Sequence, residues 1–432
     1  MLAPMAPEKQ QDPEHQDHTA RTDYRLRNHI PLGAPATREP CDGTEPSMRV
    51  SLGFTPRWYH SRLGVDFSRR WHTDPVYRYD ALVQMKEHLH ASFPRVDYFT
   101  PRYNNAGVEP TCATISGAYG IMLIPAIYGL EIDYRVDNWP DAAGGMTIPK
   151  EALAADPKPD LDASPIVAEL FSQIEQIAER WGAIHGYLNY QGILNLALKI
   201  RGNEIFMDMY DDPDFARRLF SGIAETIANL SQRVQARQRE SGFDVNLLSM
   251  SNCVINMISP ADYEQFILPH DKRLSEQYQR FGIHTCNWNA DPYLDQLRSI
   301  EKMGYLDTGA QADLARIRRR FPDSRRAVLY SPVDLEEKSE ERIEADLTRI
   351  AQDYAPCDVV LADVEATAPD DRVSFFLDTA ARLSAEFDKG RFADATDVGR
   401  LGAAEAESAS RDAGDPNTNG GDEAGAAPGV RP

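Results

Sequence analysis

Short apolar runs rich in β-branched and aromatic residues alternate along the chain with longer segments of helical period. This alternation is typical of parallel strands that are connected by crossover helices. The runs predicted as strands lie near residues 96–100, 121–136, 183–190, 245–250, 282–288, 305–308, 327–331 and 359–363. Eight such units in one domain favour a closed TIM-type (β/α)8 barrel, and the sequence has no GxGxxG or GKS/GKT loop that would favour an open nucleotide-binding sheet.

Three helix starts are marked by a capping residue followed by proline. They are Ser164-Pro165, Ser259-Pro260 and Asp212-Pro213, and the last is expected to open a long helix that runs to Glu240. Proline suits the first helical position because its missing N–H has no partner there in any case.

Both ends of the chain differ in composition from its centre. Residues 1–46 are rich in Pro, Gln, Asp, His and Arg without an apolar period, and residues 389–432 are dominated by Ala, Gly, Asp and Glu. Such segments bury too little apolar surface to fold, so we expect a disordered arm and a disordered acidic tail. No linker divides residues 47–388, which we therefore expect to form one α/β barrel domain.

The overall charge excludes two classes of partner. Lys and Arg number 46 against 67 acidic residues, a net charge of −21, whereas nucleic acids and anionic membranes require a basic surface. No apolar stretch approaches the roughly 20 residues of a membrane span, and no secretory signal is evident, so we expect a cytoplasmic protein. Five scattered cysteines are too few for a disulfide scaffold and are interpreted as thiols.

The segment FGIHTCNWNADPY, residues 281–293, contains the sharpest chemical signal. On a strand, His284 and Cys286 would face the same side, about 6.5 to 7 Å apart at Cα. An imidazole and a thiolate at that spacing can both bind one tetrahedral Zn²⁺. A buried histidine and a small apolar cysteine in a barrel interior remain the alternative.

Three further segments carry a resemblance to a known family. RGNEIF, DDPDFA and SPADYEQFILP, followed by GIHTCN, recur in this order and spacing in the uroporphyrinogen decarboxylase superfamily, which the chain resembles over most of residues 50–387. That superfamily includes the decarboxylase of haem synthesis and zinc-dependent methyltransferases that act on methylated corrinoid proteins. The resemblance implies a TIM-type barrel with its cleft at the carboxyl ends of the strands.

An arginine-rich motif near the N-terminus separates the decarboxylase branch of the superfamily from the methyltransferase branch. The decarboxylase carries PxWxMRQAGR, whose two arginines bind acidic groups of a porphyrinogen, and the corresponding stretch here is PRWYHSRLGV. Trp58 fits, but Ser61 and Val65 replace the two arginines, while Arg57 and Arg62 are out of register. The His-x-Cys pair instead resembles the zinc motif of the methyltransferases.

The third metal ligand departs from that motif. The methyltransferases use a cysteine after the last strand, whereas the matching loop here, LADVEATAPDDRV, has none. Asp363 and Glu365 lie at the carboxyl end of that strand and are the first choice, because a carboxylate is an acceptable zinc ligand. Cys253, which follows the predicted strand 245–250, is the second choice, and Cys357 is expected at the opposite end of the barrel.

Candidate substrate contacts come from three segments of the chain, and three classes of function are consistent with the sequence. The candidate residues are Arg57, Trp58, Arg62, Tyr103, Asn104, His185, Tyr187 and Asn189. The leading hypothesis is a Zn²⁺-dependent methyltransferase that transfers a methyl group to a small zinc-bound thiol from a corrinoid on a partner protein or from a similar carrier. The alternatives are a metal-free lyase of the decarboxylase type acting on a tetrapyrrole, and a non-catalytic barrel that serves as a binding module.

Overall fold

The computed structural model describes residue 32, residues 45–96 and residues 113–411, with the backbone alone from 391 to 411. The chain divides into two compact units, Met1–Ser384 and Ala385–Pro432. Among the described residues, no helix combines the length and the apolar character that crossing a bilayer requires.

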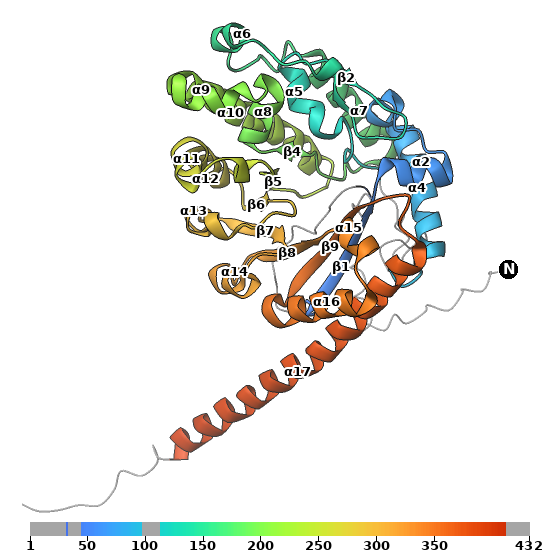
Figure 1. The fold of residues 1–432 in the computed structure, drawn as a ribbon, viewed down its shortest axis with the longest axis vertical. Helices are drawn as coiled ribbons and strands as arrows, with labels where there is room; N and C mark the ends of the chain where they lie inside the picture. Colours follow the sequence, from blue (N-terminus) through green and yellow to red (C-terminus); the bar gives the residue numbers. More distant parts are fainter. Residues whose placement is uncertain (1–31, 33–44, 97–112, 412–432) are drawn as a thin grey trace, which may run out of the picture. The chain divides into compact units, whose positions relative to one another are not determined.

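The first unit is built on a parallel sheet of seven strands in the order β1-β9-β8-β7-β6-β5-β4 (Figure 1). The strands are β1 (Met48–Phe54), β4 (Tyr190–Gln191), β5 (Leu247–Ser251), β6 (Arg280–His284), β7 (Met303–Gly309), β8 (Arg325–Tyr330) and β9 (Cys357–Val364). A separate antiparallel pair consists of β2 (Ile132–Asp133) and β3 (Asp141–Ala142). The fold is therefore α/β, with β1 and β4 at the two edges of the described sheet.

Helices connect these strands and cover the outer side of the sheet (Figure 1). The α-helices are α2 (Pro56–Leu63), α3 (Arg69–Thr73), α4 (Pro75–Ser92), α5 (Leu123–Ile127), α6 (Lys150–Ala155), α7 (Pro165–Trp181), α8 (Ile193–Arg201), α9 (Glu204–Asp211), α10 (Pro213–Glu240), α11 (Pro260–Asp262), α12 (Leu268–Glu276), α13 (Leu294–Arg298), α14 (Leu314–Arg320), α15 (Pro332–Glu337), α16 (Glu340–Tyr354) and α17 (Asp370–Arg411). The short helices are η2 (Gly120–Met122), η3 (Ala143–Gly145), η4 (Ile255–Met257), the π-helix η5 (Tyr263–Ile267) and η6 (Asp291–Tyr293).

The three expected helix starts are confirmed. Helices α7, α10 and α11 begin at Pro165, Pro213 and Pro260. The Asp212 side chain accepts from Phe215 N, and Ser259 forms a capping box with Asp262. These caps satisfy N–H groups that have no partner within the helix.

Several strand predictions need correction. The predicted strand 183–190 is a strand only at Tyr190, where β4 begins, and otherwise has an isolated bridge at His185. The run 121–136 is not a barrel strand: it folds into η2 and α5, and only β2 within it is extended. An apolar run cannot distinguish a strand from a short helix that is buried on most sides, and Leu123, Ile124 and Ile127 are all buried. Conversely, β1 was not predicted. The predicted strand 96–100 lies almost entirely outside the described residues, and neither a closed barrel nor an eighth strand of the sheet is present among the described ones.

The expected boundaries of the folded part can be compared with the described residues. Leu32, within the expected arm, is buried and forms a bridge with Phe54 of β1. At the other end, α17 continues past the expected boundary at residue 388 and ends at Arg411. The rest of both expected segments lies outside the described residues.

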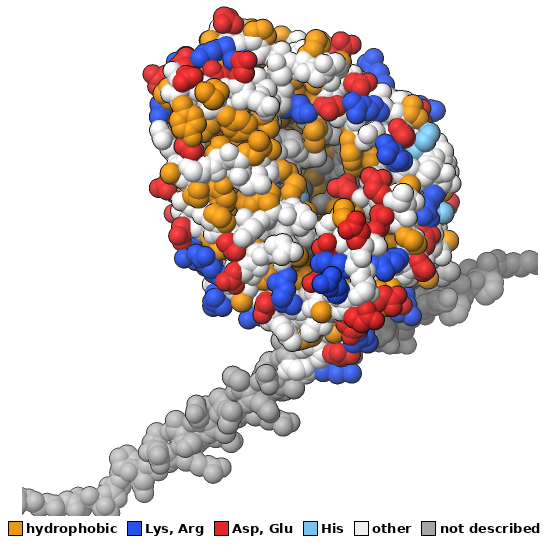
Figure 2. Space-filling view, viewed as in Figure 1, with side chains coloured by type: hydrophobic (Ala, Val, Ile, Leu, Met, Phe, Trp, Pro, Cys, Tyr) orange, Lys and Arg blue, Asp and Glu red, His pale blue; other side chains and the backbone are white. Residues whose placement is uncertain are grey.

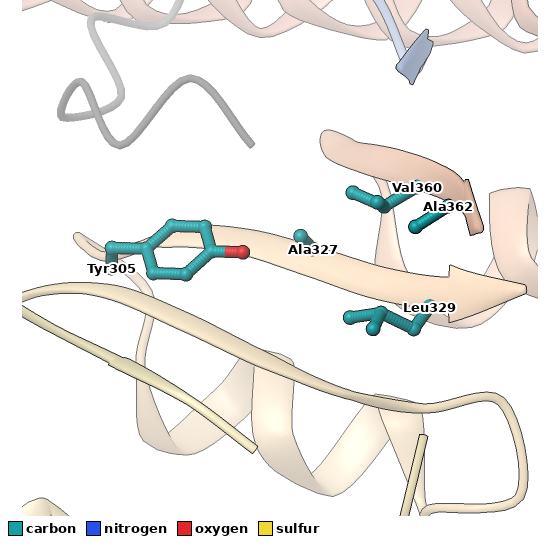
Figure 3. Packing of buried hydrophobic residues seen from close by; sticks show 5 residues of the cluster. All are labelled: Tyr305, Ala327, Leu329, Val360 and Ala362. Carbon is teal, nitrogen blue, oxygen red and sulfur yellow. The ribbon is translucent and has the colours of Figure 1, made fainter. Parts of the chain in front are cut away.

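The strand faces of β7, β8 and β9 supply part of the core. Tyr305, Ala327, Leu329, Val360 and Ala362 form one buried cluster, and Figure 3 shows their side chains on three neighbouring strands. The hydroxyl of Tyr305 leaves this cluster and donates to Asp307 Oδ2 at 2.7 Å. Tyr305 therefore connects the apolar core to the polar groups at the carboxyl ends of the strands.

The opposite ends of the strands are joined by a buried ion cluster. Asp358 of β9 accepts from Arg325 of β8 at 2.6 Å and from Arg49 of β1 at 3.1 Å. Arg325 also pairs with Glu45 at 3.2 Å, and its side chain is 2% exposed. Three strands and the segment before β1 are thus joined by charged hydrogen bonds in a largely buried region.

Candidate metal centre

Two neighbouring strands deliver a group of three potential metal ligands. Cys253 follows β5, His284 is the last residue of β6, and Cys286 follows two positions later. Their ligand atoms all lie within 4.8 Å of one another, and no other such group occurs in the described part of the chain. Parallel strands end at the same edge of a sheet, so residues distant in sequence meet here.

An unusual backbone conformation brings Cys286 to this group. The prediction that residues 282–288 form a strand is wrong beyond His284, because β6 ends there and Cys286 has a φ of 60°. This left-handed conformation is costly for a residue with a Cβ atom and often occurs at functional sites. As a result Cys286 Sγ lies 3.1 Å from His284 Nε2 and 2.8 Å from Cys253 Sγ.

The Nδ1 atom of His284, on the side of the ring away from the two sulfur atoms, contacts a buried carboxylate. This nitrogen donates to Asp307 Oδ2 at 2.5 Å, and Asp307 is fully buried in β7. The other oxygen of Asp307 accepts from Thr285 N at 2.6 Å. Because Nδ1 is engaged, Nε2 is directed at the two sulfur atoms, which is the arrangement found around metal-binding histidines.

The electrostatics of the group favour partly deprotonated ligands. Burial lowers the pKa of His284, but the Asp307 carboxylate outweighs it and raises that pKa to about 10. The hydrogen bond from Cys286 and the charge of His284 lower the pKa of the Cys253 thiol, and the same contact with Cys253 raises that of Cys286. These contacts favour the thiolate form of Cys253, which is the form in which cysteine binds metal.

The expected carboxylate ligands lie nearby but outside this group. Asp363 is solvent-exposed, has a φ of 54°, and is close enough for its charge to interact with His284 and Glu365. Glu365 accepts from Thr55 Oγ1 at 3.3 Å. Cys253, the second choice, is the residue whose ligand atom lies among those of His284 and Cys286. Cys357 is buried at the first position of β9, the end opposite Asp363.

The residues at the decarboxylase motif are engaged in other contacts. Trp58 is fully buried against Phe54, with 4.3 Å between ring centroids. The Arg62 guanidinium lies 4.2 Å over the Trp58 ring and donates to Asp370. Arg57 is exposed and lies 3.6 Å from Asp137.

The remaining candidate contacts divide between the two ends of the sheet. His185 and Tyr187 lie against Phe243, with ring centroids 5.1 and 6.0 Å away, on the amino side of β5 and thus away from Cys253. Asn189 is exposed and accepts from Gln191, which is paired with Ser251 at the carboxyl end of β5. Tyr103 and Asn104 lie outside the described residues.

Three buried polar residues of the site were not predicted. They are Asp307, Asn252 and Asp271, which are at most 1% exposed. The signal for Asp307 was present, because a charged residue within an apolar strand is costly unless it is paired. Asp271 lies in the helical segment LPHDKR and carried no such signal.

Asp271 should make the stability of the protein depend on pH. Burial raises its pKa to about 7, against hydrogen bonds from Tyr263 and Asn252 that lower it, whereas an unperturbed aspartate has 3.8. Between these values the folded chain binds a proton that the unfolded chain lacks. The contribution of Asp271 to stability is therefore complete below about pH 4 and is lost as the pH rises to about 7.

We expect Asp271→Asn to remove this dependence. Relative to the wild type, the free energy of unfolding of the variant should increase by about 1.4 kcal/mol for each pH unit within that window. Urea denaturation of both proteins at a series of pH values measures the difference. Two stability curves that stay parallel from acidic to neutral pH would contradict the prediction.

Comparisons with known proteins identify a solved structure of similar fold but no family. The sequence matches no protein-family model and no curated protein. The chain is similar in structure to a methyltransferase from Methanosarcina mazei, with a TM-score of 0.52 and 14% identity, over 85% of this chain and 98% of that one. At this identity the similarity is evidence for the fold alone, and it agrees with the α/β architecture of the first unit.

A second solved structure is more distant. It is a B12-independent methionine synthase from Shewanella sp. W3-18-1, in complex with selenomethionine, with a TM-score of 0.37 and 10% identity, over 71% of this chain and 89% of that one.

Proposed function

We propose that the protein is a zinc-dependent methyltransferase that transfers a methyl group to a small thiol. The observation that carries the proposal is the group of Cys253, His284 and Cys286, whose three ligand atoms lie within 4.8 Å of one another. Two sulfurs and one imidazole nitrogen are a common donor set for Zn²⁺, and the Asp307 contact supports His284 as a ligand. The similarity in fold to a methyltransferase agrees with this reaction class.

The metal and the residues around it have separate tasks. Zn²⁺ held by Cys253, His284 and Cys286 would supply a Lewis acid that lowers the pKa of a substrate thiol. Asp307 keeps His284 in the tautomer that presents Nε2, and the exposed Asp363 is close enough for its charge to act on His284 and Cys286. The substrate sulfur then forms a bond to the methyl carbon, while the bond from that carbon to its carrier breaks and its electron pair stays on the carrier.

The donor that we propose is a methyl group on a corrinoid, carried by a partner protein. Cobalt in such a carrier accepts the electron pair as the methyl group leaves, and the thiol proton is released to solvent. Figure 2 shows that the first unit is hollowed near the middle of one face, with apolar side chains gathered beside the hollow over α8 and α9. Met207, Tyr210 and Met257 are among the exposed apolar residues, and Met257 follows Cys253 by four positions.

The decarboxylase alternative lacks its binding groups. Arg57 and Arg62 pair with Asp137 and Asp370, and Trp58 is buried in the core. These contacts leave neither arginine arranged to hold an acidic side group of a tetrapyrrole in a bidentate pair.

Metal analysis and a transfer assay test the proposal together. We expect about one zinc per chain in protein purified without added metal. We also expect transfer of the methyl group of methylcobalamin to 2-mercaptoethanol that stops when zinc is removed by a chelator and resumes when zinc is returned. Cys286→Ser should lose both properties, whereas the control Cys357→Ser, at the opposite end of β9, should keep them. Zinc-free protein with full activity would overturn the proposal.

The hydrogen bond from His284 Nδ1 to Asp307 should determine the strength of zinc binding. We expect Asp307→Asn to weaken zinc affinity about 10- to 100-fold, because the imidazole loses the carboxylate that orients it. Competition with a chromogenic chelator measures the affinity. Tyr305→Phe removes another hydrogen bond to the same Asp307 oxygen and serves as the control. An unchanged affinity in Asp307→Asn would show that this carboxylate does not support a metal ligand.

A further inference from the structure

The segment that carries Cys253 is held by hydrogen bonds on both sides of that residue. Before it, Asn252 N donates to His284 O at 2.7 Å, which joins the ends of β5 and β6. After it, Val254 N donates to the side chain of Asn195 at 3.2 Å. Cys253 therefore lies on a short loop whose backbone is fixed at both neighbours.

The side chain of Asn252 is confined as well. It is 1% exposed, and its Nδ2 donates to Asp271 Oδ2 at 3.1 Å. Its Oδ1 lies against Gly192, where an added Cβ atom would be only 1.8 Å away. Asn252 thus fits between a glycine that leaves room for it and a carboxylate that accepts from it.

Asp271 is an unusual residue for this position. It is fully buried in α12, directly after the π-helix η5, and pairs with no Lys or Arg among the described residues. Its Oδ2 accepts from Asn252 and from Tyr263 OH at 2.8 Å, and its Oδ1 has no hydrogen-bond partner in the described part of the chain. Burying a carboxyl group with an unsatisfied oxygen costs stability. Residues that cost stability in this way are found mainly where function requires them.

We propose that Asp271 is a positioning residue of the metal centre, which acts through Asn252 to hold the Cys253 sulfur beside His284 and Cys286. The inference rests on the proposed metal site and extends it to a residue that touches neither metal nor substrate. Without the carboxylate, Asn252 loses the acceptor for its amide and can turn away from Gly192. The loop would then carry Cys253 out of reach of the metal.

Cobalt(II) tests this arrangement because thiolate ligands give it a characteristic charge-transfer absorption in the near ultraviolet. The probe is Co²⁺ added to the metal-free full-length protein. We expect Asp271→Leu to lose absorption down to the level of Cys253→Ser, and to bind Co²⁺ about 10- to 100-fold more weakly than the wild type. Asp271→Asn keeps an oxygen that can accept from Asn252 and should restore the wild-type spectrum.

Tyr263→Phe is the matched control. It removes the other hydrogen bond to the same carboxylate oxygen and leaves the contact with Asn252 in place. A change of spectrum in Asp271→Leu but not in Tyr263→Phe supports positioning through Asn252. If Asp271→Leu does not fold, Asn252→Ala breaks the same contact from the other side and should give the Cys253→Ser spectrum.

The outcomes separate the inference from the proposed function. A wild-type protein without thiolate-to-cobalt absorption would overturn both, because no thiolate metal site would then exist. A wild-type spectrum that depends on Cys253 but is unchanged in both Asp271→Leu and Asn252→Ala would overturn the inference alone. Equal spectra for the wild type and Cys253→Ser would also overturn it, because Cys253 would then not be a ligand.

Discussion

Replacing Asp358 by alanine should destabilise the protein by about 3 to 5 kcal/mol, because the buried Arg325 then keeps Glu45 but loses the carboxylate that it shares with Arg49. Asp358 is 1% exposed and accepts from arginines on both neighbouring strands. Those contacts hold its pKa well below the ordinary range, against burial, which raises it. The free energy of unfolding from urea denaturation at neutral pH measures the loss.

An exposed ion pair provides the comparison. Lys158 pairs with Glu225 at 2.8 Å on the surface, and Lys158→Ala should change stability far less, because solvent screens exposed charges. Asp358→Ala with a stability near that of Lys158→Ala would show that Glu45 or water compensates for the carboxylate that Arg325 loses. In that case the cluster would not be what joins β1, β8 and β9.

The same ion cluster explains why β1 was difficult to predict. Its sequence MRVSLGF places a charged residue near the start of an apolar run, which weakens the strand pattern. The partner of Arg49 is Asp358, more than 300 positions away, and only the folded sheet brings the two together. The strand prediction for residues 121–136 was wrong for the opposite reason. Burial on most sides of α5 removes the polar positions from which a helix is recognised.

In the candidate metal site, too, one part could be predicted from the sequence and another part could not. The spacing of His284 and Cys286 indicated a shared ligand set, and the two side chains do meet. They meet because the strand ends at His284 and Cys286 adopts a left-handed conformation, which no alternating pattern encodes. Cys253 was ranked below Asp363 and Glu365 because the family motif has its third ligand after the last strand. The proximity of Cys253 depends instead on the hydrogen bond from Asn252 N to His284 O.

Cys253→Ser should weaken zinc binding by more than about 100-fold, because loss of an orienting residue alone commonly costs about 10- to 100-fold and here a ligand itself is lost. Asp363→Ala and Glu365→Ala should bind zinc nearly as the wild type does, because neither carboxylate lies among the three clustered ligand atoms. Zinc titration against a competing chelator ranks the three variants.

The comparison decides between two ways of completing the site. A large loss in Cys253→Ser alone assigns the third position to the loop after β5, so that all three ligands come from two adjacent strand ends. A large loss in Asp363→Ala with an unchanged Cys253→Ser would return that position to the end of β9, as in the family motif. In that arrangement β9 would have to move its carboxylate inward when metal binds, because Asp363 is solvent-exposed in the structure. The site would then be completed by a residue of β9, whereas Cys253, His284 and Cys286 are the three ligands that the fold brings together at two adjacent strand ends.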